Sequence, residues 1–146
     1  MKKLLGLLAF LAVTITTTNA QNYDWAIGTR IGGTMSGVSV KHFISPLDAV
    51  EAIIAIPYKN GFNLTGLYQR HISVIQEGFQ FYYGAGAHIG ALNEKFLLGI
   101  DGVIGLEYKV PTIPLALSLD YKPMLDIVSD TKLRLEDFGL GIKVAF

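Results

Sequence analysis

The feature that most constrains the fold of this chain is a period-two alternation of apolar and polar residues. Residues 79–90 are the clearest case, because large apolar or small residues occupy the odd positions while mostly glycine and polar residues occupy the even ones. Side chains of a β-strand point alternately to the two sides of the sheet. The alternation therefore predicts strands with one apolar and one polar face.

The same pattern recurs along most of the chain, and short links separate the segments that carry it. Short links join antiparallel neighbours. We therefore predict an all-β fold, an eight-stranded antiparallel up-and-down barrel, with residues 123–133 as its one long loop. The expected strands cover residues 22–32, 35–44, 48–57, 61–72, 78–90, 96–109, 113–122 and 134–146.

The first twenty residues have the features of a secretory signal peptide. Lys2 and Lys3 form a positive start, Leu4 to Val13 form a short apolar run, and Thr18-Asn19-Ala20 supplies small residues for cleavage. The apolar run is shorter than the roughly 20 residues of a transmembrane helix. We predict a signal peptide at 1–20 and one barrel domain at 21–146.

Composition argues against several classes of function. Twelve basic residues face twelve acidic ones, so no basic surface for nucleic acid is expected. The chain has no cysteine, which excludes disulfides, thiolate metal sites and a cysteine nucleophile. Its three histidines lack the spacing of metal ligands. We expect no cofactor, no metal site and no nucleic-acid partner.

Which face of the strands points outward separates two kinds of barrel. A soluble lipocalin-like carrier has its apolar face inside, whereas a membrane barrel has it outside. Glycine weakens strands on a solvent face, but the narrow interior of eight strands needs small residues. Ten glycines fall on the polar face, at 28, 32, 37, 84, 86, 90, 99, 105, 139 and 141, and two on the apolar face, at 66 and 102. This favours the membrane barrel.

The charged residues of the polar face point to the same class. Basic and acidic residues balance there, as expected of an interior in which buried charges must be paired. The turn near Pro46 is expected to set Lys41 opposite Glu51, and the turn at 110–114 to bring Asp101 near Lys122. The predicted interior polar network consists of Arg30, Lys41, Glu51, His88, Asp101, Glu107, Asp120, Lys122 and Lys143.

Aromatic residues collect at both ends of the predicted strands, as membrane interfaces favour. If the N-terminus starts in the periplasm, the periplasmic girdle contains Tyr23, Trp25, Phe43, Tyr68, Phe79, Phe81, Tyr108 and Phe146. The opposite girdle contains Tyr58, Phe62, Phe96, Tyr121 and Phe138.

The signal peptide, the eight alternating strands and the terminal Phe146 resemble small outer-membrane β-barrel proteins of the OmpX and OmpA-barrel type. The resemblance implies a transmembrane barrel in the Gram-negative cell envelope that contacts outer-membrane lipids. In that family a last strand ending in Phe is the signal read by the barrel-assembly machinery. The matching residues here are Leu140, Ile142, Val144 and Phe146. The external links are short except the last, which departs from the long protruding loops of OmpX-like members.

This resemblance implies a structural or surface-interaction role without a defined enzymatic activity, and it identifies no extracellular partner. An open diffusion pore is not expected, because side chains fill an eight-stranded interior. Two alternatives stay open: a soluble periplasmic lipocalin-like carrier and a lipid-modifying outer-membrane enzyme.

The enzyme alternative depends on His71-Ile72-Ser73, which is similar to the His-x-Ser of outer-membrane lipid A deacylases. A serine nucleophile needs a histidine base oriented by an acid, and Glu77 is the nearest acid in the sequence. These residues fall at the predicted periplasmic rim, whereas lipid A lies in the outer leaflet. His88 could act as a proton switch, but we favour a histidine held in the interior network.

Replacing Phe146 with a polar residue is expected to impair membrane insertion, because the last strand would lose its apolar end. The yield of protein in the outer membrane measures the effect. A normal yield of the variant would contradict the prediction.

Overall fold

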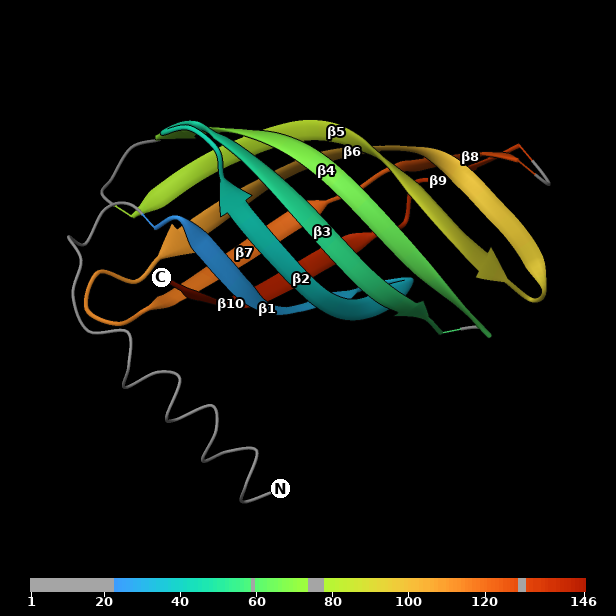
Figure 1. The fold of residues 1–146 in the computed structure, drawn as a ribbon, viewed down its shortest axis with the longest axis horizontal. Helices are drawn as coiled ribbons and strands as arrows, with labels where there is room; N and C mark the ends of the chain where they lie inside the picture. The colour runs from blue at the N-terminus through green and yellow to red at the C-terminus, as the bar shows by residue number, and fades with distance from the viewer. Residues whose placement is uncertain (1–22, 59, 74–77, 129–130) are drawn as a thin grey trace, which may run out of the picture.

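The computed structural model describes residues 23–58, 60–73, 78–128 and 131–146 as a closed antiparallel β-barrel (Figure 1). The expected signal peptide and Glu77 lie outside the described residues, as does the side chain of Ser73. The described residues contain no helix that is long and apolar enough to cross a membrane.

From β1 to β7 each strand pairs with the next along the chain, β8 pairs with β6 and β9, and β10 closes the barrel by pairing with both β1 and β7. The bounds are β1 Trp25–Gly32, β2 Met35–Phe43, β3 Asp48–Pro57, β4 Gly61–Ser73, β5 Phe79–Leu92, β6 Lys95–Lys109, β7 Leu115–Tyr121, β8 Met124–Val128, β9 Lys132–Arg134 and β10 Phe138–Ala145.

Ten strand segments make eight positions in the wall. β6 pairs with β7 through Ile104–Lys109 and with β8 through Leu98–Asp101, so β7 and β8 form one interrupted wall strand. β9 and β10 form another in the same way, because they pair with β8 and β7. The predicted eight-stranded up-and-down barrel is therefore confirmed.

The interruption between β7 and β8 falls at Pro123. Proline has no backbone N–H to give to a sheet, but the carbonyl of Pro123 still accepts a 2.9 Å hydrogen bond from the Gly102 amide. The prediction of a long loop at 123–133 is wrong, because the chain resumes pairing beyond this proline and forms the β8–β9 hairpin.

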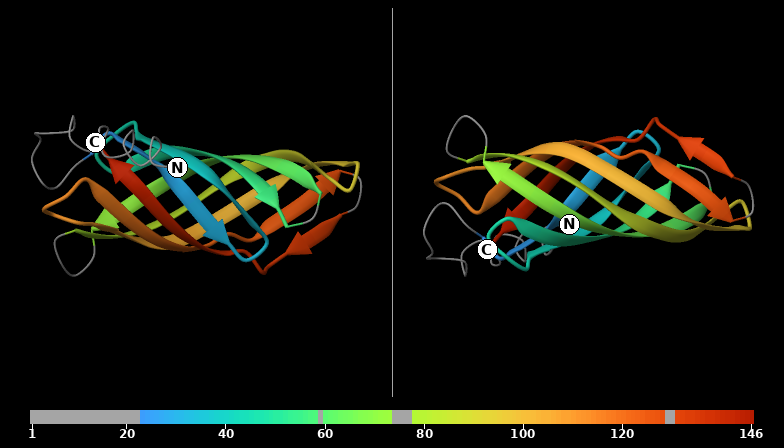
Figure 2. Two further views of the ribbon diagram at one scale, coloured as in Figure 1. Left: turned by 90° about the horizontal axis from the view of Figure 1, so that it is seen from below. Right: turned by 90° about the horizontal axis from the view of Figure 1, so that it is seen from above.

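We call the end where β1 begins and β10 finishes the proximal end, and the opposite end the distal end. Strands cross obliquely between the two, and β5, β6 and the β8–β9 hairpin reach the distal end (Figure 2). The β5–β6 hairpin turns there through only Asn93 and Glu94, with φ of 50° and 66°. Two consecutive residues with positive φ form the tight turn whose twist matches that of the flanking strands.

Large aliphatic side chains cover the outside of the wall. Ile54 and Ile56 on β3 are 64% and 68% exposed, and Leu140 on β10 is 57% exposed. Their neighbours in sequence point inward, as the alternation requires. Aliphatic exposure that continues around the whole wall is far more than the surface of a soluble monomer carries.

Glycines make room for large polar side chains on the inside. A Cβ on Gly105 would lie 2.6 Å from Cζ of Tyr82 and 2.7 Å from the carbonyl oxygen of Leu119, and one on Gly139 would lie 2.5 Å from Cζ of Arg30. By contrast, a Cβ on Gly66, one of the two glycines assigned to the apolar face, would have no atom within 4 Å. Inward glycines such as Gly105 and Gly139 are therefore needed because the interior has no space for a larger side chain there.

This difference predicts opposite results for two alanine substitutions. Gly105→Ala should lower the free energy of unfolding by about 1–3 kcal/mol, because the methyl group overfills the interior. Gly66→Ala serves as the control and should change it by less than about 0.5 kcal/mol. Urea titration in detergent micelles measures both, and equal effects would contradict the assignment of faces.

Candidate functional site

The candidate site is the interior of the barrel. The structure places all nine residues of the predicted polar network there, each less than 9% exposed. They come from opposite sides of the wall and, with further polar residues, form three clusters along the barrel. The predicted members are Arg30, Lys41, Glu51, His88, Asp101, Glu107, Asp120, Lys122 and Lys143.

The proximal cluster joins two lysines and two glutamates. Lys41 Nζ lies 2.7 Å from Glu107 Oε2, and Lys143 donates to Glu51. Glu51 also accepts hydrogen bonds from Ser39 and, at 2.5 Å, from Nε2 of Gln69. Two positive and two negative charges are thus held together, so the cluster is neutral.

Lys41 and Glu51 stand opposite each other in the β2–β3 register, as the sequence predicts. Lys41 nevertheless bonds to Glu107 on β6, on another part of the wall. A long side chain on the inner face extends into the lumen, where it meets residues of non-adjacent strands. Strand register alone therefore does not identify the partners of interior ions.

The central cluster is built around Arg30 on β1. Its guanidinium Nη2 lies 2.5 Å from Asp120, and Nη1 lies 2.9 Å from Asp137. Tyr82 donates to Asp120 over 3.3 Å. Lys122 Nζ lies 3.6 Å from both Asp137 and Asp101, and thus links this cluster to the distal one.

The distal cluster surrounds His88 on β5. Its Nδ1 contacts Asp101 on β6, and its Nε2 lies 2.8 Å from Asp126 on β8. Oδ2 of Asp126 also accepts two hydrogen bonds from Arg134 on β9, from Nη2 at 2.6 Å and from Nε at 2.9 Å. The expected proximity of Asp101 and Lys122 is found at 3.6 Å between the ammonium and Oδ2.

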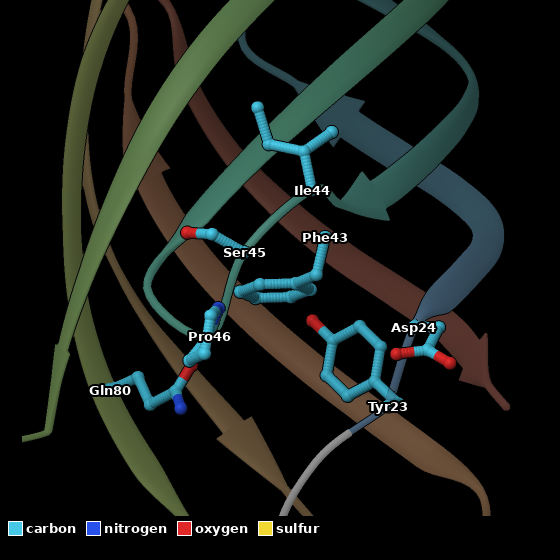
Figure 3. Close-up of a pocket in the computed structure, with 7 residues that line it drawn as sticks. All are labelled: Tyr23, Asp24, Phe43, Ile44, Ser45, Pro46 and Gln80. Atoms are coloured by element: carbon cyan, nitrogen blue, oxygen red, sulfur yellow. The ribbon is translucent and has the colours of Figure 1, made fainter.

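Two residues predicted in the periplasmic girdle, Tyr23 and Phe43, turn inward instead. Their rings meet edge to face with centroids 5.1 Å apart (Figure 3), and Tyr23 donates a hydrogen bond to Glu107. Burial raises the pKa of Tyr23, and the negative charge of Glu107 acts in the same direction. The phenol therefore stays a donor and helps to close the proximal end, beside a cavity of about 290 Å³.

Other aromatic residues do face outward at the two ends. Trp25, Tyr68, Phe79 and Phe146 are exposed at the proximal end, and Tyr58, Phe62, Phe96 and Phe138 at the distal end. Leu140 and Ile142 of the predicted assembly signal are exposed as well, and Val144 is half-buried. Phe146 extends the pairing with β1, because its amide donates to the Trp25 carbonyl at 2.7 Å.

His71, the histidine of the enzyme alternative, lies in the interior among polar and aromatic side chains. It is buried, stacks on Tyr82 with ring centroids 5.0 Å apart, and contacts Gln80 and Gln69 at 3.1 Å and 3.4 Å. Both ring nitrogens thus face amides, while the Ser73 side chain and Glu77, the other members of the predicted set, lie outside the described residues.

Sequence reasoning missed two residues of the distal cluster, Asp126 and Arg134. Asp126 lies in the segment that was expected to be a loop, and Arg134 is the first residue of the expected last strand. Met124 and Asp126 alternate with Leu125 and Ile127, so a short period-two pattern was present. Pro123 directly before it concealed the strand.

The proximal cluster predicts strong coupling between Lys41 and Glu107. Lys41→Met should cost about 3–5 kcal/mol, because it leaves a buried carboxylate without its partner. Lys41→Met with Glu107→Gln should cost less than the sum of the two single changes. Urea unfolding of all four proteins in the same micelles measures the coupling, and additive costs would contradict the ion pair.

Comparison with known proteins supports the fold. No protein-family model matches the chain, and no curated protein matches it. One solved structure, described as "De novo design of transmembrane beta-barrels", aligns with a TM-score of 0.64 over 89% of this chain and 98% of that chain, at 14% sequence identity. The fold is thus an all-β, closed eight-stranded antiparallel barrel that resembles a designed transmembrane barrel.

Proposed function

We propose that this protein is an integral outer-membrane barrel that acts as an inserted structural platform and presents its distal hairpins for contact outside the cell. The observation that supports this most strongly is the reversed polarity of the barrel. Aliphatic side chains cover the outside, while paired ions fill the inside. Lipid favours this arrangement and water does not.

The proposed orientation places the proximal end in the periplasm. Both ends of the barrel chain, Trp25 and Phe146, lie there, as expected of an even number of strands. The distal end then faces outward and offers polar residues around a cavity of about 520 Å³, among them Asn93, Lys132 and Glu136. Contact with a surface partner would use this end.

We further propose that the barrel is not an open pore and has no enzymatic activity. The side chains of Lys41, Tyr82 and Arg30 reach into the lumen, and each contacts residues of other strands. A ring of this size leaves no continuous aqueous channel once such side chains occupy it. A soluble carrier of apolar ligands would need an apolar lumen, whereas charged and polar side chains fill the lumen of this barrel.

Membrane fractionation and an unboiled gel test the proposal. The folded protein should partition into detergent, reside in the outer-membrane fraction and migrate differently before and after boiling. Recovery from the periplasm without detergent would contradict it. A change in lipid A composition on expression, abolished by His71→Gln, would instead support the enzyme alternative.

A lipid-facing lysine gives an independent test. Ile104 is 45% exposed on β6, near the middle of the wall. Ile104→Lys should lower the free energy of unfolding by about 2–4 kcal/mol in lipid vesicles. Ile104→Ala is the control and should cost clearly less. If the lysine is tolerated as well as the alanine, the wall does not face hydrocarbon.

A further inference from the structure

We propose that His88 carries a positive charge and fastens the β8–β9 hairpin to the barrel wall, so that loss of its proton releases the hairpin and widens the distal mouth. The structural basis is the position of the ring between two carboxylates. Asp101 belongs to β6, which is part of the continuous wall, whereas Asp126 belongs to β8, which is part of the hairpin.

With both aspartates ionised, the contacts require a doubly protonated ring. A neutral imidazole has one N–H and one lone pair, whereas the imidazolium donates from both nitrogens. Carboxylates have no hydrogen to offer, so a neutral His88 would set a lone pair against Asp101 or Asp126 inside the barrel. The ring and both carboxylates are almost completely buried, so the ring must find its hydrogen-bond partners within the protein.

His71 provides the contrast within the same lumen. Its two nitrogens face Gln80 and Gln69, and an amide can either donate or accept. A neutral ring satisfies that site once one amide is oriented with its NH₂ toward it. The chain thus buries one histidine among amides and another between acids.

The balance of interior charge supports the same conclusion. The proximal and central clusters are each neutral, with two basic and two acidic side chains. With Lys122 counted in the central cluster, although it also lies 3.6 Å from Asp101, the distal cluster sets Arg134 against Asp101 and Asp126. A positive His88 makes this cluster neutral too, as a low-dielectric interior requires.

Other groups packed around the ring leave the two acids as its main partners. On the β4 side the cross-strand partner of His88 is Thr65, with Asn63 two residues along, and neither side chain titrates. On the β6 side the ring occupies the space over Gly99, where a Cβ would lie 2.5 Å from Cε1. The two nearby cations contact the acids and not the ring: Lys122 pairs with Asp101, and Arg134 pairs with Asp126.

Besides this contact, the hairpin is attached through the β6–β8 pairing and through Met124, whose side chain is buried in the lumen at the start of β8. β8 pairs with β6 at four positions, with an irregularity between Leu98 and Gly99, and Pro123 separates it from β7. Within the described residues, β9 pairs with β8 alone. Asp126 and Arg134 also line the distal cavity of about 520 Å³, so movement of the hairpin would change access to it.

Nitrogen NMR of the imidazole rings tests the charge directly in the unmodified, ¹⁵N-histidine-labelled barrel in micelles. At neutral pH, His88 should show two protonated nitrogens, while His71 should show one. The loss of one set of signals in His88→Gln assigns the resonance. A single protonated nitrogen on His88 at neutral pH would overturn the proposal without any need for a variant.

Spin labels test the movement, and the absence of native cysteine makes labelling simple. Asn60→Cys and Lys132→Cys place labels on the β3–β4 turn and on β9, at exposed positions. We expect one distance in the parent protein and a second, longer one in His88→Gln. The same longer distance should appear in the parent at the alkaline pH at which the imidazolium signals disappear.

His71→Gln is the matched control, since it also removes a buried histidine but should keep the single distance. Migration on an unboiled gel shows that each labelled variant has folded. An unchanged distance in folded His88→Gln, or a hairpin that moves at a pH where the imidazolium persists, would show that His88 does not fasten it.

Discussion

Closure of the backbone ladder by β1 and β10 is the constraint on which the rest of this barrel depends. In hydrocarbon, every backbone amide and carbonyl must find a partner within the protein, and a closed sheet achieves this without an edge. Once the wall is closed, it encloses a narrow lumen, and every second residue of each strand must point into it. The inner residues are therefore limited by volume and charge, whereas the outer ones need only be apolar.

The same residues satisfy the limits on volume and on charge in the lumen, because glycines leave the space in which ions meet their partners. Arg30 reaches Asp120 and Asp137 because Gly139 leaves space for its guanidinium, and His88 reaches its two acids because Gly99 leaves space for its ring. A larger residue at either glycine would displace an ion from its partners. The glycines are thus part of the electrostatic arrangement, and not only of the packing.

The sequence was sufficient to predict the fold class and the direction of most side chains, because period-two alternation reports directly on the two faces of a strand. It could not predict the ion partners, since Lys41 and Glu107 are brought together by the curvature of the wall rather than by pairing. Tyr23 and Phe43 were misplaced because an aromatic residue at a strand end can face either way. The β8–β9 hairpin was missed because Pro123 resembles the start of a loop.

The alternation has a consequence for how such a chain can vary over time. An outward residue such as Ile54 is 64% exposed, so its exact shape matters little to the packing and other aliphatic residues can replace it. An inward residue such as Glu51 contacts Ser39, Gln69 and Lys143 at once, so a change there must be accompanied by changes on other strands. Two such barrels can therefore share a shape while almost no positions in their sequences agree. Their common ancestry would then be visible mainly as sets of interior residues that change together.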